Sequence, residues 1–160
     1  MKAIVRMLGL TVVVAIGLGS QSWAQGADEL EEAGLAHFKR GYYEDLPKQR
    51  TAEAAAEFRM AEAALRRAIK QNPARASAHL HLGRTLFVQQ KYREAAEVYG
   101  EALKIDPGNK PVYLQLASAR EMAGDYPGAA AALEQLRSRE DDPQAARMID
   151  ELISRMRARQ

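Results

Sequence analysis

The chain has 160 residues, 47% of them hydrophobic but only 6% aromatic, which suits one small, alanine-rich helical unit. Two of its 23 Lys and Arg residues, Lys2 and Arg6, lie in the first 24 positions, so the remaining 21 balance the 21 Asp and Glu and give no electrostatic reason to expect nucleic acid. The absence of cysteine excludes disulfides, thiol catalysis and cysteine-ligated metals.

The first 24 residues have the pattern of a secretory signal peptide. A basic start is followed by a mostly apolar run at 7–19, and Ser22 and Ala24 place small residues on either side of Trp23. The alternative is an uncleaved membrane anchor, but the run is shorter than the roughly 20 residues needed to cross a bilayer. We expect cleavage after Ala24 and a periplasmic or secreted bacterial protein whose mature form has no membrane span.

Residues 27–75 contain the elements of a first helical hairpin. Gly34 and Gly41 stand seven apart, as Gly83 and Gln90 do further along the chain. Gly34 and Gly83 each fall within a helical pattern, and Gly41 and Gln90 each stand where a turn is expected. The pattern therefore predicts a first helix that ends in a turn near Gly41.

The second helix of this hairpin does not follow at once. Its pattern begins at Phe58, so the distance from Tyr43 is about 15 residues too long for one repeat. Either residues 44–57 form an inserted loop, or the second helix is extended from near Thr51 and leaves a short loop around Leu46. The alanine, glutamate and arginine residues that follow Thr51 favour the helix.

Residues 76–109 show the repeat most clearly. A shift of 34 residues in either direction places large and small residues over residues of the same size class. The matched positions are Phe58, Ala61, Leu65 and Ala68, then Tyr92, Ala95, Tyr99 and Ala102, then Tyr126, Ala129, Leu133 and Leu136. Spacings of three and four put each set on one helical face. Gly83 is small enough to let the second helix approach the first closely.

The chain ends in a further helix. Pro143 suits its first turn, and apolar residues on one face suit a cap over the open end of a stack: Ile149, Leu152, Ile153 and Met156. The arginines at its end are expected to be solvated and to complement the helix dipole, not to form an anion site.

These residues resemble a known family. Leu82, Gly83, Tyr92, Ala95, Tyr99, Ala102, Asp106 and Pro107 are similar to the pattern of a tetratricopeptide repeat. The resemblance implies an all-α, right-handed superhelix of three hairpins, at about 27–75 with an insertion at 44–57, then 76–109 and 110–142, with a capping helix at 143–158. The sequence departs from the family pattern at His79, where a tryptophan is frequent, and at Ala117 and Arg120.

No catalytic, cofactor or metal site is expected. His79 and His81 are two apart and point to different sides of a helix, so they cannot share a metal as an i, i+4 pair can. His37 stands where the family usually has an aromatic, which favours packing over acid–base work. No nucleophile–base arrangement or phosphate-binding loop is present, and we expect no enzyme.

The resemblance also implies where a partner binds. In tetratricopeptide arrays the first helix of each hairpin lines a concave groove that holds peptides or partner helices. On this chain the groove positions are Ser77, Leu80, His81, Arg84, Phe87, Val88, Leu114, Gln115, Ser118, Glu121 and Met122. The carboxylate clamp of some family members is absent, because its positions hold Glu31, Leu35, His81, Pro111 and Gln115.

The expected function is that of a scaffold or adaptor that binds a protein segment in this groove, in a bacterial envelope or secretion assembly. The alternative is an accessory subunit of an envelope enzyme or maturation complex. Three repeats are near the minimum for independent stability, so a partner or homo-oligomer is expected to stabilise the protein.

Overall fold

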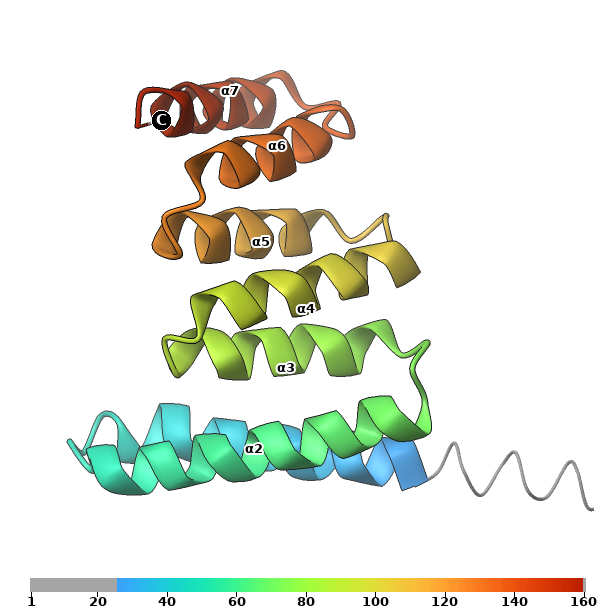
Figure 1. Ribbon diagram of the computed structural model, residues 1–160, viewed down its shortest axis with the longest axis vertical. Coiled ribbons are helices and arrows are strands. Elements are labelled where there is room, and N and C mark those ends of the chain that lie inside the picture. The colour runs from blue at the N-terminus through green and yellow to red at the C-terminus, as the bar shows by residue number, and fades with distance from the viewer. Residues whose placement is uncertain (1–25, 160) are drawn as a thin grey trace, which may run out of the picture.

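The computed structural model describes residues 26–159, and all regular secondary structure in that range is helical. A helix at 26–39 runs into a π-helix, η1 (Arg40–Asp45), and is followed by α2 (Thr51–Gln71), α3 (Ala76–Val88), α4 (Tyr92–Ile105), α5 (Lys110–Met122), α6 (Tyr126–Arg137) and α7 (Pro143–Arg157). The helices stack in one column from the first hairpin to α7 (Figure 1). The expected signal peptide and its cleavage site lie outside the described residues.

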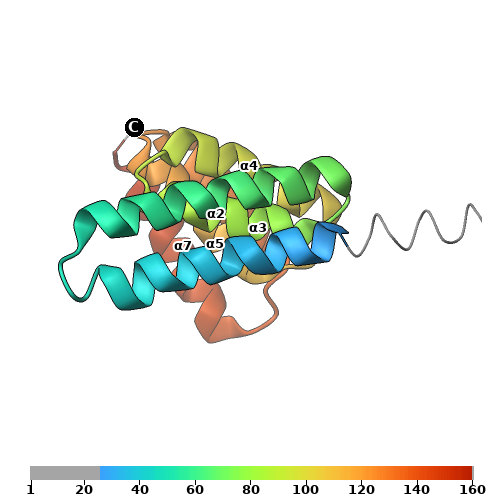
Figure 2. The same ribbon diagram turned by 90° about the horizontal axis from the view of Figure 1, so that it is seen from below.

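The stack consists of three antiparallel hairpins and a final helix. Helix 26–39 pairs with α2, α3 with α4, and α5 with α6, while α7 packs on α6 (Figures 1 and 2). The expectation of an all-α superhelix with a C-terminal cap is therefore confirmed. Between residues 26 and 159, no helix combines the length and the apolar character that crossing a bilayer requires.

The first hairpin follows the second of the two alternatives, an extended second helix after a short loop around Leu46, but its first helix does not end near Gly41 as predicted. The chain makes no turn near Gly41; it continues through η1 and turns at Gln49, whose φ of 59° is left-handed, eight residues later. The second helix begins at Thr51, seven residues before Phe58. The extra residues thus lengthen both helices instead of one, and the first hairpin projects beyond those stacked on it (Figure 2).

The reason for this difference is the packing of Gly41. A Cβ at this position would lie 3.0 Å from the Phe58 ring and 3.2 Å from the Ala54 carbonyl oxygen, so the glycine allows close helix contact instead of a turn. The turn forms between Asp45 and Arg50. The buried Asp45 carboxylate pairs with the Arg50 guanidinium, and the Asp45 carbonyl oxygen accepts a hydrogen bond from the Arg50 amide.

Close contact within the middle hairpin depends on Gly83, as the sequence predicted. A Cβ there would lie 2.5 Å from the ring of Tyr99, which is only 2% exposed. Ala95, the expected small residue on α4, is fully buried. A large side chain and a small one therefore interlock at this crossing.

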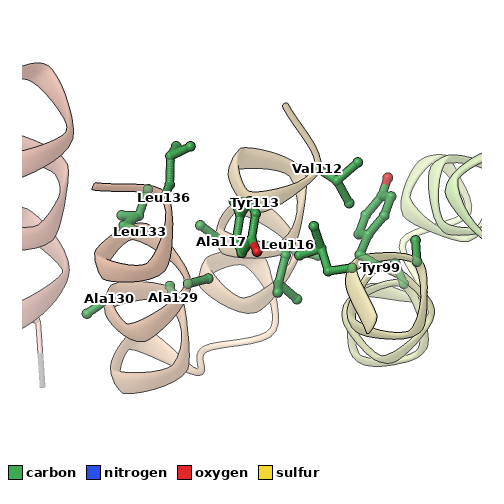
Figure 3. Close-up of a cluster of buried hydrophobic side chains, with 14 of the residues drawn as sticks. Tyr99, Val112, Tyr113, Leu116, Ala117, Ala129, Ala130, Leu133 and Leu136 are labelled. Carbon is green, nitrogen blue, oxygen red and sulfur yellow. The ribbon is translucent and has the colours of Figure 1, made fainter. Parts of the chain in front are cut away.

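One apolar core runs along the stack. Tyr99 of α4 meets α5 residues such as Val112 and Leu116, and Leu133 and Leu136 carry the core on through α6 (Figure 3). At the end of the stack, α7 buries Ala146, Ile149, Ile153 and Met156, and Leu152 packs partly buried beside them. The predicted apolar face of the last helix is the one that contacts α6.

Candidate functional site

A groove of about 350 Å³ lies along one face of the stack. It is formed mainly by alternate elements, namely the first helix with η1, then α3, then α5. Its lining residues are Phe38, Tyr42, Tyr43, Arg84, Phe87, Val88, Tyr99, Gln115 and Ser118. The volume falls at the lower end of the range typical of ligand sites, which is enough for a few side chains of a partner.

Several residues predicted for the groove are brought together there. Arg84, Phe87 and Val88 reach it from α3, and Gln115 and Ser118 reach it from α5. α3 and α5 are the first helices of consecutive hairpins. Residues three or four apart on each helix point to the same side of the stack.

The other predicted groove residues lie outside this cavity. Leu80 packs against the apolar core, and Ser77 is exposed in the first turn of α3. Leu114 and Met122 are exposed on α5, 44% and 53% respectively. Glu121 accepts a hydrogen bond from Arg159 at 2.9 Å, which ties α5 to the C-terminal end.

His81 faces the first hairpin and not the groove lining. Its Nε2 lies 3.6 Å from Oε1 of Glu31. Burial lowers the pKa of His81, and the positive charges of Arg84 and Lys39 lower it further. Because the imidazole is disfavoured as a cation, it adds no charge to this end of the site near neutral pH.

Arg84 is held by a neutral partner. With its amide oxygen turned toward the guanidinium, Gln115 accepts from Nε at 3.2 Å and from Nη2 at 3.0 Å. Among residues 26–159, no carboxylate lies within ion-pair distance of Arg84. The guanidinium therefore has no carboxylate partner among these residues, and its contacts with Gln115 fix its orientation beside the groove.

The aromatic residues of the first hairpin form one wall of the groove, which we call the aromatic wall: Phe38, Tyr42 and Tyr43. The Phe38 and Tyr42 rings stack with centroids 5.6 Å apart and planes 10° apart. Tyr43 meets Tyr42 edge to face at 5.1 Å. Tyr42 and Tyr43 remain 42% and 67% exposed, so much of their surface is free for contact.

The aromatic wall was not predictable from the repeat pattern, which indicated a turn near Gly41. The π-helical bond from the Leu46 amide to the Gly41 carbonyl, 3.0 Å long, adds a residue to the turn, so both tyrosines stay on the helix. The i, i+4 spacing of Phe38 and Tyr42 was a usable signal, since such pairs share a helical face.

The histidines serve local contacts. His37 Nδ1 lies 2.7 Å from Oε2 of Glu57, so its partner is a carboxylate and not an apolar neighbour. His79 is buried, and its Nδ1 lies 3.0 Å from the Arg75 carbonyl oxygen. In the part of the chain that the structure describes, no three potential metal ligands cluster.

A second, larger cavity of about 570 Å³ lies between α4 and the turn that joins α5 to α6. Its charges balance, because Arg93, Lys104 and Arg120 face Glu97, Glu101 and Asp125. Lys104 already pairs with Glu101 at 2.6 Å, and Arg120 donates to the Gly128 carbonyl oxygen at 2.7 Å. Because its charges balance and none of its lining residues is aromatic, this cavity is a weaker candidate than the groove.

Comparison with family models identifies the repeats. Two models described as tetratricopeptide repeat match the chain, one over residues 50–110 and the other over residues 86–152. No curated protein sequence matches this chain.

Solved structures with the same fold include domains from a plant, a yeast and a bacterium. The TPR domain of Arabidopsis OM64 is 20% identical, with a TM-score of 0.63 over 83% of this chain and 98% of that one. The TPR2B domain of yeast Sti1 in its pHsp70 complex is 20% identical, with a TM-score of 0.64 over 85% and 99%. The Yersinia enterocolitica type III secretion chaperone SycD, in complex with a peptide of the translocator YopD, is 12% identical, with a TM-score of 0.61 over 82% and 94%.

Proposed function

Because residues 50–152 of this chain are tetratricopeptide repeats, we propose that it is a non-enzymatic adaptor that binds a peptide segment or partner helix in its groove. One observation carries the proposal: Arg84 and Gln115, from successive hairpins, meet beside an exposed aromatic surface in one open cavity. Such a combination of an arginine with aromatic anchors is typical of the centres of protein interfaces.

The wider setting is part of the same proposal. The N-terminal sequence pattern supports export, and an exported adaptor would act in a bacterial envelope or secretion assembly. SycD, which has this fold, is a secretion chaperone that holds a peptide of its translocator. The motifs for catalysis are missing from the sequence, which supports a role in binding.

Site-specific crosslinking in the native host tests the proposal. A photoreactive phenylalanine analogue replaces Ser118, which is exposed and lines the groove, or in a matched control replaces Glu97, which is exposed on α4 away from it. We expect one defined protein to be crosslinked from position 118 and not from position 97. Equal crosslinking from both positions, or none from position 118, would contradict an adaptor role for the groove.

A further inference from the structure

The groove has an unbalanced positive charge. Of the residues within 26–159 that line it, Arg84 is the one that carries a charge. Three carboxylates of the elements around the groove are paired with other cations, Glu31 with Arg75, Glu57 with His37 and Arg40, and Glu121 with Arg159, while Glu44 is exposed next to Tyr43. Among residues 26–159, no carboxylate lines this cavity or pairs with Arg84.

The guanidinium of Arg84 is positioned to accept an anion from outside. It has five N–H donors, of which Gln115 engages two, one on Nε and one on Nη2. Because these contacts fix the plane of the group, the remaining donors can meet a carboxylate with little loss of side-chain entropy. A charged hydrogen bond of this kind is stronger than a neutral one.

The aromatic wall lines the same cavity. Tyr42 and Tyr43 expose ring surface that, within residues 26–159, no other helix covers. Amphipathic rings of this kind give large contact area at small entropic cost, and they favour apolar or aromatic side chains of a partner. Since the cavity measures about 350 Å³, the anionic group and the apolar group of an occupant must be near neighbours.

We propose, on the basis of the function proposed above, that the occupant is an acidic peptide segment in which an Asp or Glu pairs with Arg84 while a large apolar side chain within two residues lies against Tyr42 and Tyr43. Two residues of an extended segment span roughly 7 Å, and side chains at that spacing point to the same side. The lengthened first hairpin is then the element that makes the groove selective, because its extra turns carry the tyrosines.

Selection from a random peptide library tests the chemistry of the occupant. The peptides are displayed on phage between two coat-protein segments, so that only side-chain carboxylates are available. The bait is the full-length protein, compared with Arg84→Glu and with Arg67→Glu, a control at an exposed arginine of α2 outside the groove.

We expect the wild type and Arg67→Glu to enrich sequences with Asp or Glu within two residues of Phe, Tyr, Trp or Leu. Arg84→Glu should lose this preference and enrich Lys or Arg in its place. Enrichment without acidic residues, or an unchanged preference in Arg84→Glu, would overturn the inference while leaving a peptide-binding groove intact. Failure to enrich any peptide would contradict the proposed function itself.

The aromatic wall has its own test with a synthetic peptide taken from the selection. The double change Tyr42→Ala and Tyr43→Ala removes exposed rings, and Met148→Ala is a control at an exposed apolar residue of α7. We expect the tyrosine variant to bind at least about tenfold more weakly at unchanged helicity and melting temperature, and the control to bind as wild type. Equal affinity of the tyrosine variant and the wild type would refute the role of the wall.

Discussion

Two glycines in the middle of neighbouring helices should respond differently to the same substitution. Gly83 lies within α3 and Gly100 within α4. Alanine is favoured over glycine by about 1 kcal/mol inside a helix, so on propensity alone both substitutions would stabilise the protein. The surroundings of the added methyl group decide the outcome.

At Gly83 the methyl group has no room. Its carbon would lie 2.5 Å from Cε1 and 2.6 Å from Cδ1 of Tyr99, a ring buried between helices. Overpacking of this kind costs about 1–3 kcal/mol, which exceeds or cancels the propensity gain. At Gly100 no atom lies within 4 Å of the added carbon, so the gain of up to about 1 kcal/mol is kept.

Urea denaturation followed by far-UV circular dichroism measures the difference. We expect Gly100→Ala to be more stable than wild type and Gly83→Ala to be less stable than Gly100→Ala by about 1–3 kcal/mol. If Gly83→Ala matches Gly100→Ala, the close contact of α3 with Tyr99 does not exist in solution and the assigned hairpin packing is wrong.

Four further predictions concern the turns, the polar contacts, the histidines and the N-terminus. Gln90 has a left-handed φ of 62°, a conformation strained for a residue with a side chain, and its counterpart in the next repeat is Gly124 at 79°. Gln90→Gly should therefore raise the free energy of unfolding in urea by up to about 1 kcal/mol, and a decrease would refute the strain. Burial raises the pKa of Glu62, but hydrogen bonds from Lys91, Arg66 and Gln89 outweigh it and hold the pKa below the ordinary 4.5. The ionised Glu62 carboxylate therefore stabilises the fold above its unfolded pKa, and this stabilisation is lost as pH falls through its folded pKa. Glu62→Gln should accordingly flatten the acid limb of a plot of melting temperature against pH. An unchanged acid limb would contradict this role of Glu62. Zinc or a chelator should leave the melting temperature unchanged, and a large shift with stoichiometric zinc would reveal a metal site. N-terminal sequencing of the protein from the extracytoplasmic fraction should begin at Gln25, whereas a retained Met1 would contradict cleavage.

The helical hairpins were predictable because their packing is written into local spacing. Gly83 and Tyr99 belong to helices whose periodic pattern predicts both the crossing and its small residue, and the structure places them in contact. The last helix followed from its apolar face in the same way. In each case the sequence pattern and the tertiary contact express one physical requirement, which is burial at a spacing of three or four residues.

The first hairpin was only partly predictable. The extra length between Tyr43 and Phe58 was visible in the sequence, but its division between two helices depends on how Gly41 meets Phe58 and on the π-helical turn that follows. These are tertiary effects, and a repeat pattern transferred from the middle hairpin ended the first helix too early, at Gly41, although it allowed the loop around Leu46 and the helix start at Thr51. The aromatic wall was missed for that reason.

The groove residues, too, were only partly predictable from the sequence. The positions of Arg84, Phe87, Gln115 and Ser118 on first helices place them on one face, and the structure brings them into one cavity. His81 and Leu80 are on the same helix but do not line this cavity: His81 lies beside Glu31, and Leu80, one turn or more before Arg84 and Phe87, packs against the core. Helical spacing alone does not separate these two sets, because the neighbouring hairpin decides which turn stays open.

The central claim is that the face formed by the first hairpin, α3 and α5 binds a peptide. Chemical-shift mapping by NMR tests it most directly, with the labelled full-length protein titrated with a peptide enriched in the selection above. We expect the perturbed signals to cluster at Phe38, Tyr42, Arg84, Gln115 and Ser118 and to saturate together. Perturbations centred instead on Gly100 and the cavity beside α4, with the groove signals unchanged, would contradict it.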